Sequence, residues 1–184
     1  TGVLVKNKQN YEDNSASFAG AGNTFAARSA GAWGNSLLVA TCPSANAFEQ
    51  TTTTAQQTDG AAAVGDTSIT VDSDATSYLN VGDIIEFSST ASGVDFTTGE
   101  KYRITGLTAT SVTIVQHPRG EGGLITAVVD NARIKRKWRY ADQVDGAPGT
   151  SAYASARSGS NDEIHVVVID EDGGVSGVPG TILE

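Results

Sequence analysis

The residues best suited to chemistry in this chain form a run of cations near its middle: Arg133-Ile134-Lys135-Arg136-Lys137-Trp138-Arg139-Tyr140. Five of the twelve lysine and arginine residues lie in these eight positions. If the run is a strand, alternation places Arg133, Lys135, Lys137 and Arg139 on one face, with Arg136 as the exception on the other. Two interpretations stay open. The face is a subunit contact that docks on an acidic surface of a neighbour, or it is a solvated strand face whose lysines block unwanted pairing.

Residues with the chemistry for catalysis are few. His117 and His165 are the only histidines, and Cys42 is the only cysteine. No spacing places a nucleophile beside either imidazole, and a histidine within a strand is more often structural. We therefore expect no enzyme activity, no catalytic residues and no bound cofactor.

Two acidic segments are candidate calcium-binding loops, namely Asp72-Ser73-Asp74 and Asp170-Glu171-Asp172-Gly173-Gly174. Neither is followed by the further ligands and the final glutamate that an EF-hand loop requires. Aspartate and glycine also favour tight turns, through local hydrogen bonds and positive φ angles. We expect a hairpin turn at residues 170–174 and no metal site.

Charge and hydropathy exclude several classes. The formal net charge is −9, which disfavours nucleic-acid binding because a positive surface must displace the counterions of the phosphates. No apolar run approaches the roughly 20 residues that a membrane-spanning helix needs, so we expect no membrane insertion. Methionine is absent, even from position 1, and we expect a processed product or a fragment of a longer protein.

The residue composition and pattern of the sequence change twice along the chain. Residues 1–48 combine a strand expected at 3–5, a turn-like polar segment at 10–14, a short helix at 24–30 and a strand at 35–41 that is apolar on both faces. Residues 49–140 open with a threonine-rich linker and continue with short alternating strands between turns. Residues 141–184 resemble residues 1–48 in composition and pattern, with a strongly apolar strand expected at 163–169.

These patterns predict a mainly β or α+β protein. The two ends, 1–48 and 141–184, are expected to form one discontinuous α+β domain. Residues 49–140 are expected to form an inserted small antiparallel β-barrel or sandwich. Its alternating strands are expected at 67–71, 81–87, 101–104 and 111–114.

A tryptophan between two glycines precedes the strand at 35–41. Gly31 and Gly34 allow a sharp turn and a close approach of the backbone. We expect Trp33 to fold over that strand as a buried apolar plug, with a free indole N–H for a carbonyl partner.

The same segment, Ala30-Gly31-Ala32-Trp33-Gly34-Asn35-Ser36-Leu37-Leu38-Val39, resembles the Gly-x-Trp-Gly-Asn-x-Leu-x-Val segment of contractile tail sheath proteins of phages. Residues 149–154 (GTSAYA) and 161–173 (NDEIHVVVIDEDG) look like the corresponding part of T-even-type myophage sheaths, and residues 178–184 (VPGTILE) continue the similarity. The matching segments cover the two chain ends, and residues 49–140 carry no such motif.

The resemblance implies a structural virion protein without an active site or cofactor. Sheath subunits form stacked six-fold rings around the tail tube, and their contraction drives the tube through the host envelope for genome ejection. The implied partners are other sheath subunits, the tail tube protein and the baseplate. The implied location is the tail sheath of the virion, after assembly in the host cytoplasm. Sheath proteins are several-fold longer than this chain.

A second function stays open. A β-rich sequence with abundant threonine and serine and few charges also suits a carbohydrate-binding or adhesin-type module of a virion or cell surface. Exposure of aromatic side chains discriminates between the two, because a glycan binder needs them on an open face.

Overall fold

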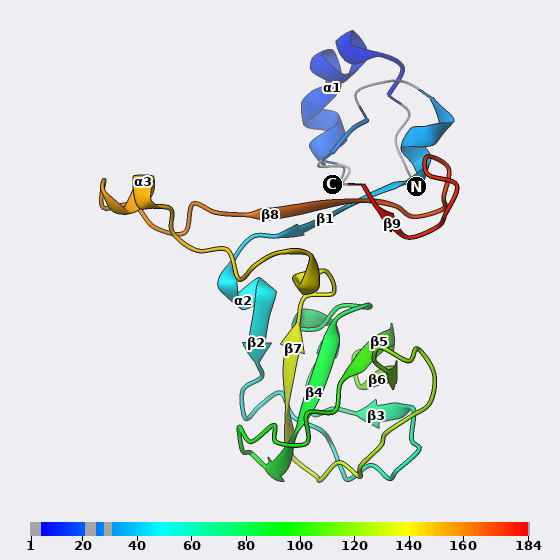
Figure 1. Cartoon of the computed structure of the whole chain (residues 1–184), viewed down its shortest axis with the longest axis vertical. Coiled ribbons are helices and arrows are strands. Elements are labelled where there is room, and N and C mark those ends of the chain that lie inside the picture. Colours follow the sequence, from blue (N-terminus) through cyan, green and yellow to red (C-terminus); the bar gives the residue numbers. More distant parts are fainter. Residues whose placement is uncertain (1–4, 21–24, 28–30, 184) are drawn as a thin grey trace. The chain divides into compact units, whose positions relative to one another are not determined.

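The computed structural model describes residues 5–20, 25–27 and 31–183, and it divides the chain into two compact units. The first unit combines residues 1–41 with 166–184, and the second is continuous over Cys42–His165 (Figure 1). Residues 42–48 and 141–165, which the sequence pattern assigns to the domain of the chain ends, therefore lie in the second unit. Both sheets of the chain are antiparallel, and the described residues are mostly β.

The first unit contains a helix and a three-stranded sheet. Helix α1 (Lys8–Gly20) is followed by a 3-10 turn η1 (Ala32–Ser36) and strand β1 (Leu37–Cys42), and β8 (His165–Asp170) and β9 (Thr181–Ile182) form a hairpin near the other end of the chain. The strand order is β1-β8-β9, so β8 is central. The expected strands at 35–41 and 163–169 are confirmed as β1 and β8, and the loop between β8 and β9 confirms the expected hairpin turn.

Helix α1 overturns the expectation of a turn at residues 10–14. The Asn7 side chain accepts a hydrogen bond from the Asn10 amide at 2.8 Å, and the Asn10 side chain accepts one from the Lys6 amide at 3.1 Å. This reciprocal pair satisfies free N–H groups at the start of a helix, so the asparagines act as caps. The helix has a kink at Asn14. The strand expected at 3–5 and the helix expected at 24–30 lie largely outside the described residues.

The second unit is built on a six-stranded sheet with the order β2-β7-β4-β5-β6-β3. Its strands are β2 (Glu49–Thr51), β3 (Ser68–Thr70), β4 (Ile84–Ala91), β5 (Tyr102–Leu107), β6 (Ser111–Gln116) and β7 (Ala132–Lys137). Short helical segments are α2 (Ala45–Phe48), η2 (Ala75–Ser77), η3 (Ala141–Gln143) and α3 (Ala152–Ser155). None of the described helices is long and apolar enough to cross a bilayer.

Period-two alternation explains the core of the second unit. Apolar side chains from alternate positions of β3 to β7 converge on one face of the sheet, where burial removes them from water. The largest fully buried side chains of this core are Ile69, Ile85, Tyr102, Ile104, Val112, Ile114 and Ile134 on the strands, joined by Leu79 and Leu124 from the loops. The alternating strands expected within residues 67–114 are thereby confirmed, although β4 begins later and extends further than residues 81–87.

The six-stranded ladder does not close into a barrel. Residues between β2 and β3 nevertheless connect its two sides through isolated bridges. Gln57 pairs with Arg133 on β7, and Thr58 pairs with Val71, which directly follows β3. The Thr58 amide donates to the Ala132 carbonyl at 3.0 Å, and the Asp72 amide donates to the Gln57 carbonyl at 3.0 Å.

Candidate functional site

The densest polar cluster of the first unit joins η1 to the end of β8. The Ser36 hydroxyl donates to Asp170 Oδ1 at 2.5 Å and accepts hydrogen bonds from the amides of Asp172 at 3.2 Å and Gly174 at 3.0 Å. Ser36 is 5% exposed and Asp170 is fully buried. We call this cluster, completed by Ser176, the corner network.

Asp170 uses its second oxygen in the same network. Oδ2 accepts from the Val175 amide at 3.0 Å, the Ser176 amide at 2.6 Å and the Ser176 hydroxyl at 2.7 Å. Burial by itself raises the pKa of Asp170, but the hydrogen bonds from Ser176, Ser36 and Val175 outweigh it and hold the pKa well below its ordinary value. Hydrogen bonds from the chain itself thus occupy both oxygens of this carboxylate.

The corner network unites segments that are distant in the sequence. It joins the end of the Gly-Ala-Trp-Gly-Asn segment to the Asp-Glu-Asp-Gly turn. Leu183 also donates its amide to the Val168 carbonyl at 2.8 Å. Segments from both halves of the chain thus share one sheet, in which β8 lies between β1 and β9 (Figure 1).

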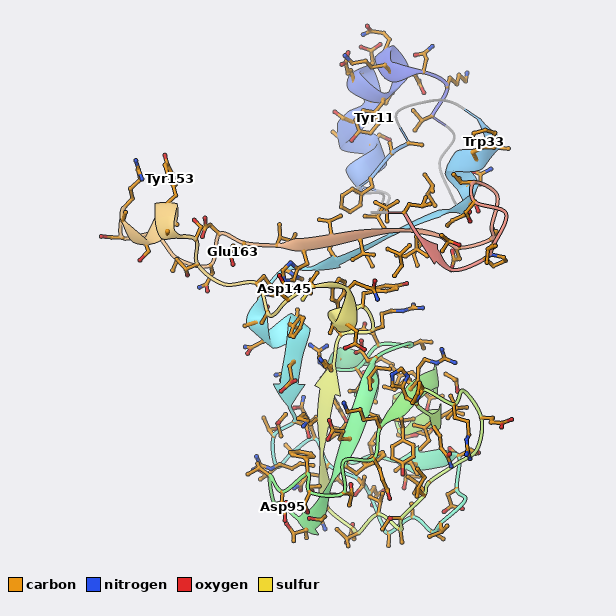
Figure 2. All side chains as sticks on the ribbon, in the orientation of Figure 1. Tyr11, Trp33, Asp95, Asp145, Tyr153 and Glu163 are labelled. Atoms are coloured by element: carbon orange, nitrogen blue, oxygen red, sulfur yellow. The ribbon has the colours of Figure 1, made fainter. Side chains whose placement is uncertain are left out.

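Trp33 contradicts the expectation of a buried plug. It lies in η1 and is 70% exposed (Figure 2). The buried residue of η1 is Ser36, which makes polar contacts with Asp170 and the loop after β8. Gly34 does have the expected close approach, since a Cβ there would lie 2.9 Å from the Ala27 Cβ.

Strand β1 is also less buried than its apolar sequence predicts. Leu37, Leu38, Val39 and Ala40 are all partly exposed. A three-stranded sheet beside one polar helix supplies too little surface, within the described residues, to cover both faces.

The cationic run forms strand β7 and continues to Tyr140, with the expected alternation. Arg133, Lys135, Lys137 and Arg139 occupy the more exposed positions, while the residues between them are mostly buried. Of the four cations of the predicted contact face, Arg133, Lys135 and Lys137 therefore lie on one side of β7, and Arg139 lies in the turn that follows the strand. We call these four residues the basic face.

Two members of the basic face have acidic partners within the second unit. Lys135 Nζ lies 3.1 Å from Glu86 Oε1, and Lys137 Nζ lies 3.4 Å from Asp142 Oδ1. No ion pair to Arg133 or Arg139 is found within residues 5–20, 25–27 and 31–183. The Lys137–Asp142 pair is exposed and contributes only about 0–1 kcal/mol, whereas the side chains of Lys135 and Glu86 are only 26% and 14% exposed.

Arg136 is the structurally important cation of the run. It is 9% exposed, and its Nη1 lies 3.5 Å from Asp83 Oδ2. The guanidinium also donates to the Ala47 carbonyl at 3.2 Å and the Asn46 carbonyl at 2.8 Å, which fixes α2 to the sheet. Burial raises the pKa of Asp83, and the Arg136 charge opposes that shift. The sequence did carry a signal for this role. Arg136 is the one cation of the run at an inward position of the strand, and an inward arginine needs a buried partner.

A polar hollow of about 280 Å³ lies beside Arg136. Its lining residues are Gln50, Gln56, Thr76, Ser77, Tyr78, Leu79, Asn80 and Arg136. Amides and hydroxyls dominate this lining, and the one cation is paired with Asp83. The hollow can therefore offer hydrogen bonds to a small neutral polar molecule but no net charge.

His165 has a structural environment. Its Nε2 forms a hydrogen bond of 2.8 Å with the Gly146 carbonyl, and its ring packs between Trp138 and Phe48 at centroid distances of 6.5 and 6.3 Å. Cys42 is fully buried, and burial raises the pKa of its thiol. In the part of the chain that the structure describes, no three His, Cys, Asp or Glu side chains are grouped closely enough to hold a metal ion.

Comparison with known proteins adds no relative from which a function could be transferred. No protein family, no curated protein and no solved structure matches this chain.

Proposed function

We propose that the chain is a structural virion protein, part of the contractile sheath that surrounds a phage tail tube. The observation that carries this proposal is the arrangement of the motif segments. Of the four segments that resemble sheath sequences, residues 30–39, 161–173 and 178–184 contribute to the three strands of one sheet and to the Ser36–Asp170 contact, whereas residues 149–154 lie in the second unit. Segments that serve one shared structure are expected to come together in this way.

The division of the chain into two compact units supports a more detailed proposal about its domain organisation. The chain ends build a discontinuous sheath domain, and the continuous unit between them is an inserted β module. The module has its own hydrophobic core, and the bridges at Gln57 and Thr58 bring its architecture close to a barrel. An insert with an independent core can be added without disturbing the pairing of β8 with β1 and β9.

The basic face serves as a subunit contact in this proposal. Arg133 and Arg139 are the members best placed to bind an acidic neighbour, since Lys135 and Lys137 already have acidic partners. Charged contacts fix the register and orientation of two subunits without a large apolar interface. Such contacts suit subunits whose interactions change on contraction. The partners are further sheath subunits, the tail tube protein and the baseplate.

Electron microscopy of virions tests the proposal. Antibodies raised against the 184-residue chain should label contractile-tailed particles along the whole length of the sheath, and the labelled region should shorten on contraction. Antibodies against an unrelated capsid protein provide the control. Labelling confined to the capsid or to fibre tips would refute a sheath role.

A carbohydrate-binding or adhesin-type role is the second candidate, and the exposure of Trp33 favours it. An exposed indole offers a flat apolar face against which a sugar ring can stack. A sugar on this residue would change its fluorescence and protect it from acrylamide, and Trp33→Phe would remove both effects. If a broad panel of oligosaccharides leaves the fluorescence unchanged, this second role is excluded.

A further inference from the structure

The dipeptide Asp-Gly occurs three times in this chain, at residues 59–60, 145–146 and 172–173. In such a pair the backbone nitrogen of the glycine can attack the side chain of the aspartate, because glycine has no side chain to hinder the approach. The attack needs a peptide group that can rotate until its nitrogen meets the carboxyl carbon. Local structure therefore decides which of the three pairs can react.

The first pair is held on both sides of its peptide group. The Gly60 amide donates a hydrogen bond to Asp130 Oδ1 at 2.8 Å, and the Asp59 carbonyl accepts one from the Thr70 hydroxyl. Gly60 also has a φ angle of 84°, in the left-handed region that favours glycine. Rotation of this peptide group would break both hydrogen bonds.

The third pair lies beside the corner network. The Asp172 amide donates to the Ser36 hydroxyl at 3.2 Å, and the Gly173 carbonyl accepts from the Gly177 amide at 2.9 Å. A Cβ on Gly173 would lie 2.8 Å from Pro179 Cδ, so the backbone is closely packed there. Packing and hydrogen bonds therefore both oppose rotation in this turn.

The second pair has neither restraint. Asp145 and Gly146 are exposed and lie in a bend that follows η3 (Figure 2). Among the described residues, the Asp145 carboxylate, the Asp145 carbonyl and the Gly146 amide have no hydrogen-bond or ion-pair partner. A Cβ on Gly146 would have no atom of the described residues within 4 Å. The peptide group between these two residues can therefore rotate.

We propose that Asp145 is a site of spontaneous isoaspartate formation, and that the fold protects Asp59 and Asp172 from the same reaction. The Gly146 nitrogen attacks Cγ of the protonated Asp145 side chain. The N–Cγ bond forms, the Cγ–OH bond breaks, and the hydroxyl leaves with the amide proton as water, which closes a succinimide ring.

Water then opens the succinimide at either of its two carbonyl groups. Opening at Cγ restores aspartate, whereas opening at the main-chain carbonyl leaves the chain linked through Cγ as isoaspartate. One water molecule is released and one is consumed, so the product has the mass of the original chain. Water is the only co-reactant, and the reaction proceeds whether or not the chain belongs to a sheath.

Isoaspartate at position 145 would alter a contact of His165. The Gly146 carbonyl lies 2.8 Å from His165 Nε2, and the isomer inserts a methylene group into the main chain directly before Gly146. The His165 ring packs against Trp138 and Phe48. Displacement of the carbonyl removes the partner of the imidazole, so the packing around Trp138 should loosen.

Incubation of the native chain in heavy-oxygen water measures the reaction at each pair, because every passage through the succinimide adds one oxygen atom from the solvent. Peptide mass spectrometry should find the label and the isoaspartate linkage at position 145 in several-fold excess over positions 59 and 172. Asp59-Gly60-Ala61 is the matched internal control, since residues 145–147 have the same sequence. In urea the excess over position 59 should disappear. Equal labelling in the native chain, or an excess that persists in urea, would overturn the proposal.

Two variants separate the effect of the fold from the chemistry of the dipeptide. Gly146→Ala should suppress the reaction at Asp145, because the new methyl group hinders the attack and has room in the fold. Asp130→Ala removes the acceptor of the Gly60 amide and should raise labelling at Asp59 several-fold. An unchanged rate at Asp59 would contradict the protection assigned to this hydrogen bond.

Fluorescence measures the consequence for Trp138. In a Trp33→Phe background Trp138 is the remaining tryptophan, and its emission should shift to longer wavelength as isoaspartate accumulates. The same background with Gly146→Ala should keep its emission through the incubation. A constant emission from a chain in which position 145 is modified would refute the effect on His165.

Discussion

Removal of the Ser36 hydroxyl is the most direct test of the corner network. Ser36→Ala deletes one hydrogen bond donated to the Asp170 carboxylate and two accepted from the amides of Asp172 and Gly174. The substitution leaves the volume of the side chain almost unchanged, so the effect reports on polar contacts rather than on a cavity. We expect it to destabilise the pairing of η1 and β1 with the turn after β8.

The expected loss follows from the partners of the hydroxyl. A hydrogen bond to a charged group contributes about 1.5–3 kcal/mol, and a neutral one about 0.5–1.5 kcal/mol. Asp172 and Gly174 are exposed, so water can replace much of what their amides lose. Asp170 keeps its three donors from Val175 and Ser176. The free energy of opening the first unit should therefore fall by about 2–3 kcal/mol.

Hydrogen exchange measured by mass spectrometry resolves this effect by segment. Protection of amides in β1 and β8 should fall by about 30- to 140-fold, at about 1.4 kcal/mol for each factor of ten. Peptides from β4 and β5 in the second unit provide an internal reference. Ser17→Ala is the matched control, because Ser17 is an exposed serine of the first unit and no hydrogen bond of its side chain is found within the described residues. Unchanged protection in β1 and β8, or an equal loss in the control, would refute the reasoning.

Four further predictions follow from burial and charge. Trp33→Ala should change the free energy of unfolding by no more than about 0.5 kcal/mol, as measured by urea denaturation, because the indole is exposed. Arg136→Met should cost about 3–5 kcal/mol in the same assay, because it leaves the buried Asp83 carboxylate without its cation. Cys42 should react with Ellman's reagent far more slowly in the folded chain than in urea, because its thiol is buried and its pKa is raised. Asp170 has a depressed folded pKa, so its contribution to stability is complete above its unfolded pKa of about 3.9. That contribution should disappear as the pH falls below about 4, measured as exchange protection of β8.

Each of these predictions has its own control. Acrylamide should quench Trp33 strongly and the buried Trp138 weakly, and equal quenching would contradict the assigned exposures. Arg136→Lys keeps the charge and should lose less stability than Arg136→Met; an equal loss would show that the charge is not the cause. Rapid labelling of Cys42 in the native chain would contradict its burial. Asp170→Asn should remove the acid dependence of β8, and an unchanged dependence would assign it to other carboxylates.

Local patterns in the sequence predicted a large part of the fold. Alternation of apolar residues predicted strands β3 to β6 and their inward side chains, because the side-chain period of a strand is fixed at two. If residues 133–140 were a strand, the same rule put their cations on one face, and β7 does so for Arg133, Lys135 and Lys137. Alternation could not show that Lys135 pairs with Glu86 on β4, because the two residues are far apart in the sequence, or that the chain turns after β7 to bring Asp142 to Lys137. It also did not reveal the hydrogen bonds within residues 149–163, which link serine, threonine and acidic residues on both sides of α3.

The sequence by itself determined the β class, the inward face of each alternating strand and the motif segments at both chain ends, because these depend on local periodicity and on residue identity. Only the tertiary structure decided the burial of Ser36 and Asp170, the exposure of Trp33 and the role of Arg136. These depend on contacts between residues far apart in the chain: Ser36 and Asp170 are 134 positions apart. A tryptophan between glycines has the same local pattern whether it is buried or exposed. The local pattern alone therefore could not decide whether Trp33 is buried or exposed.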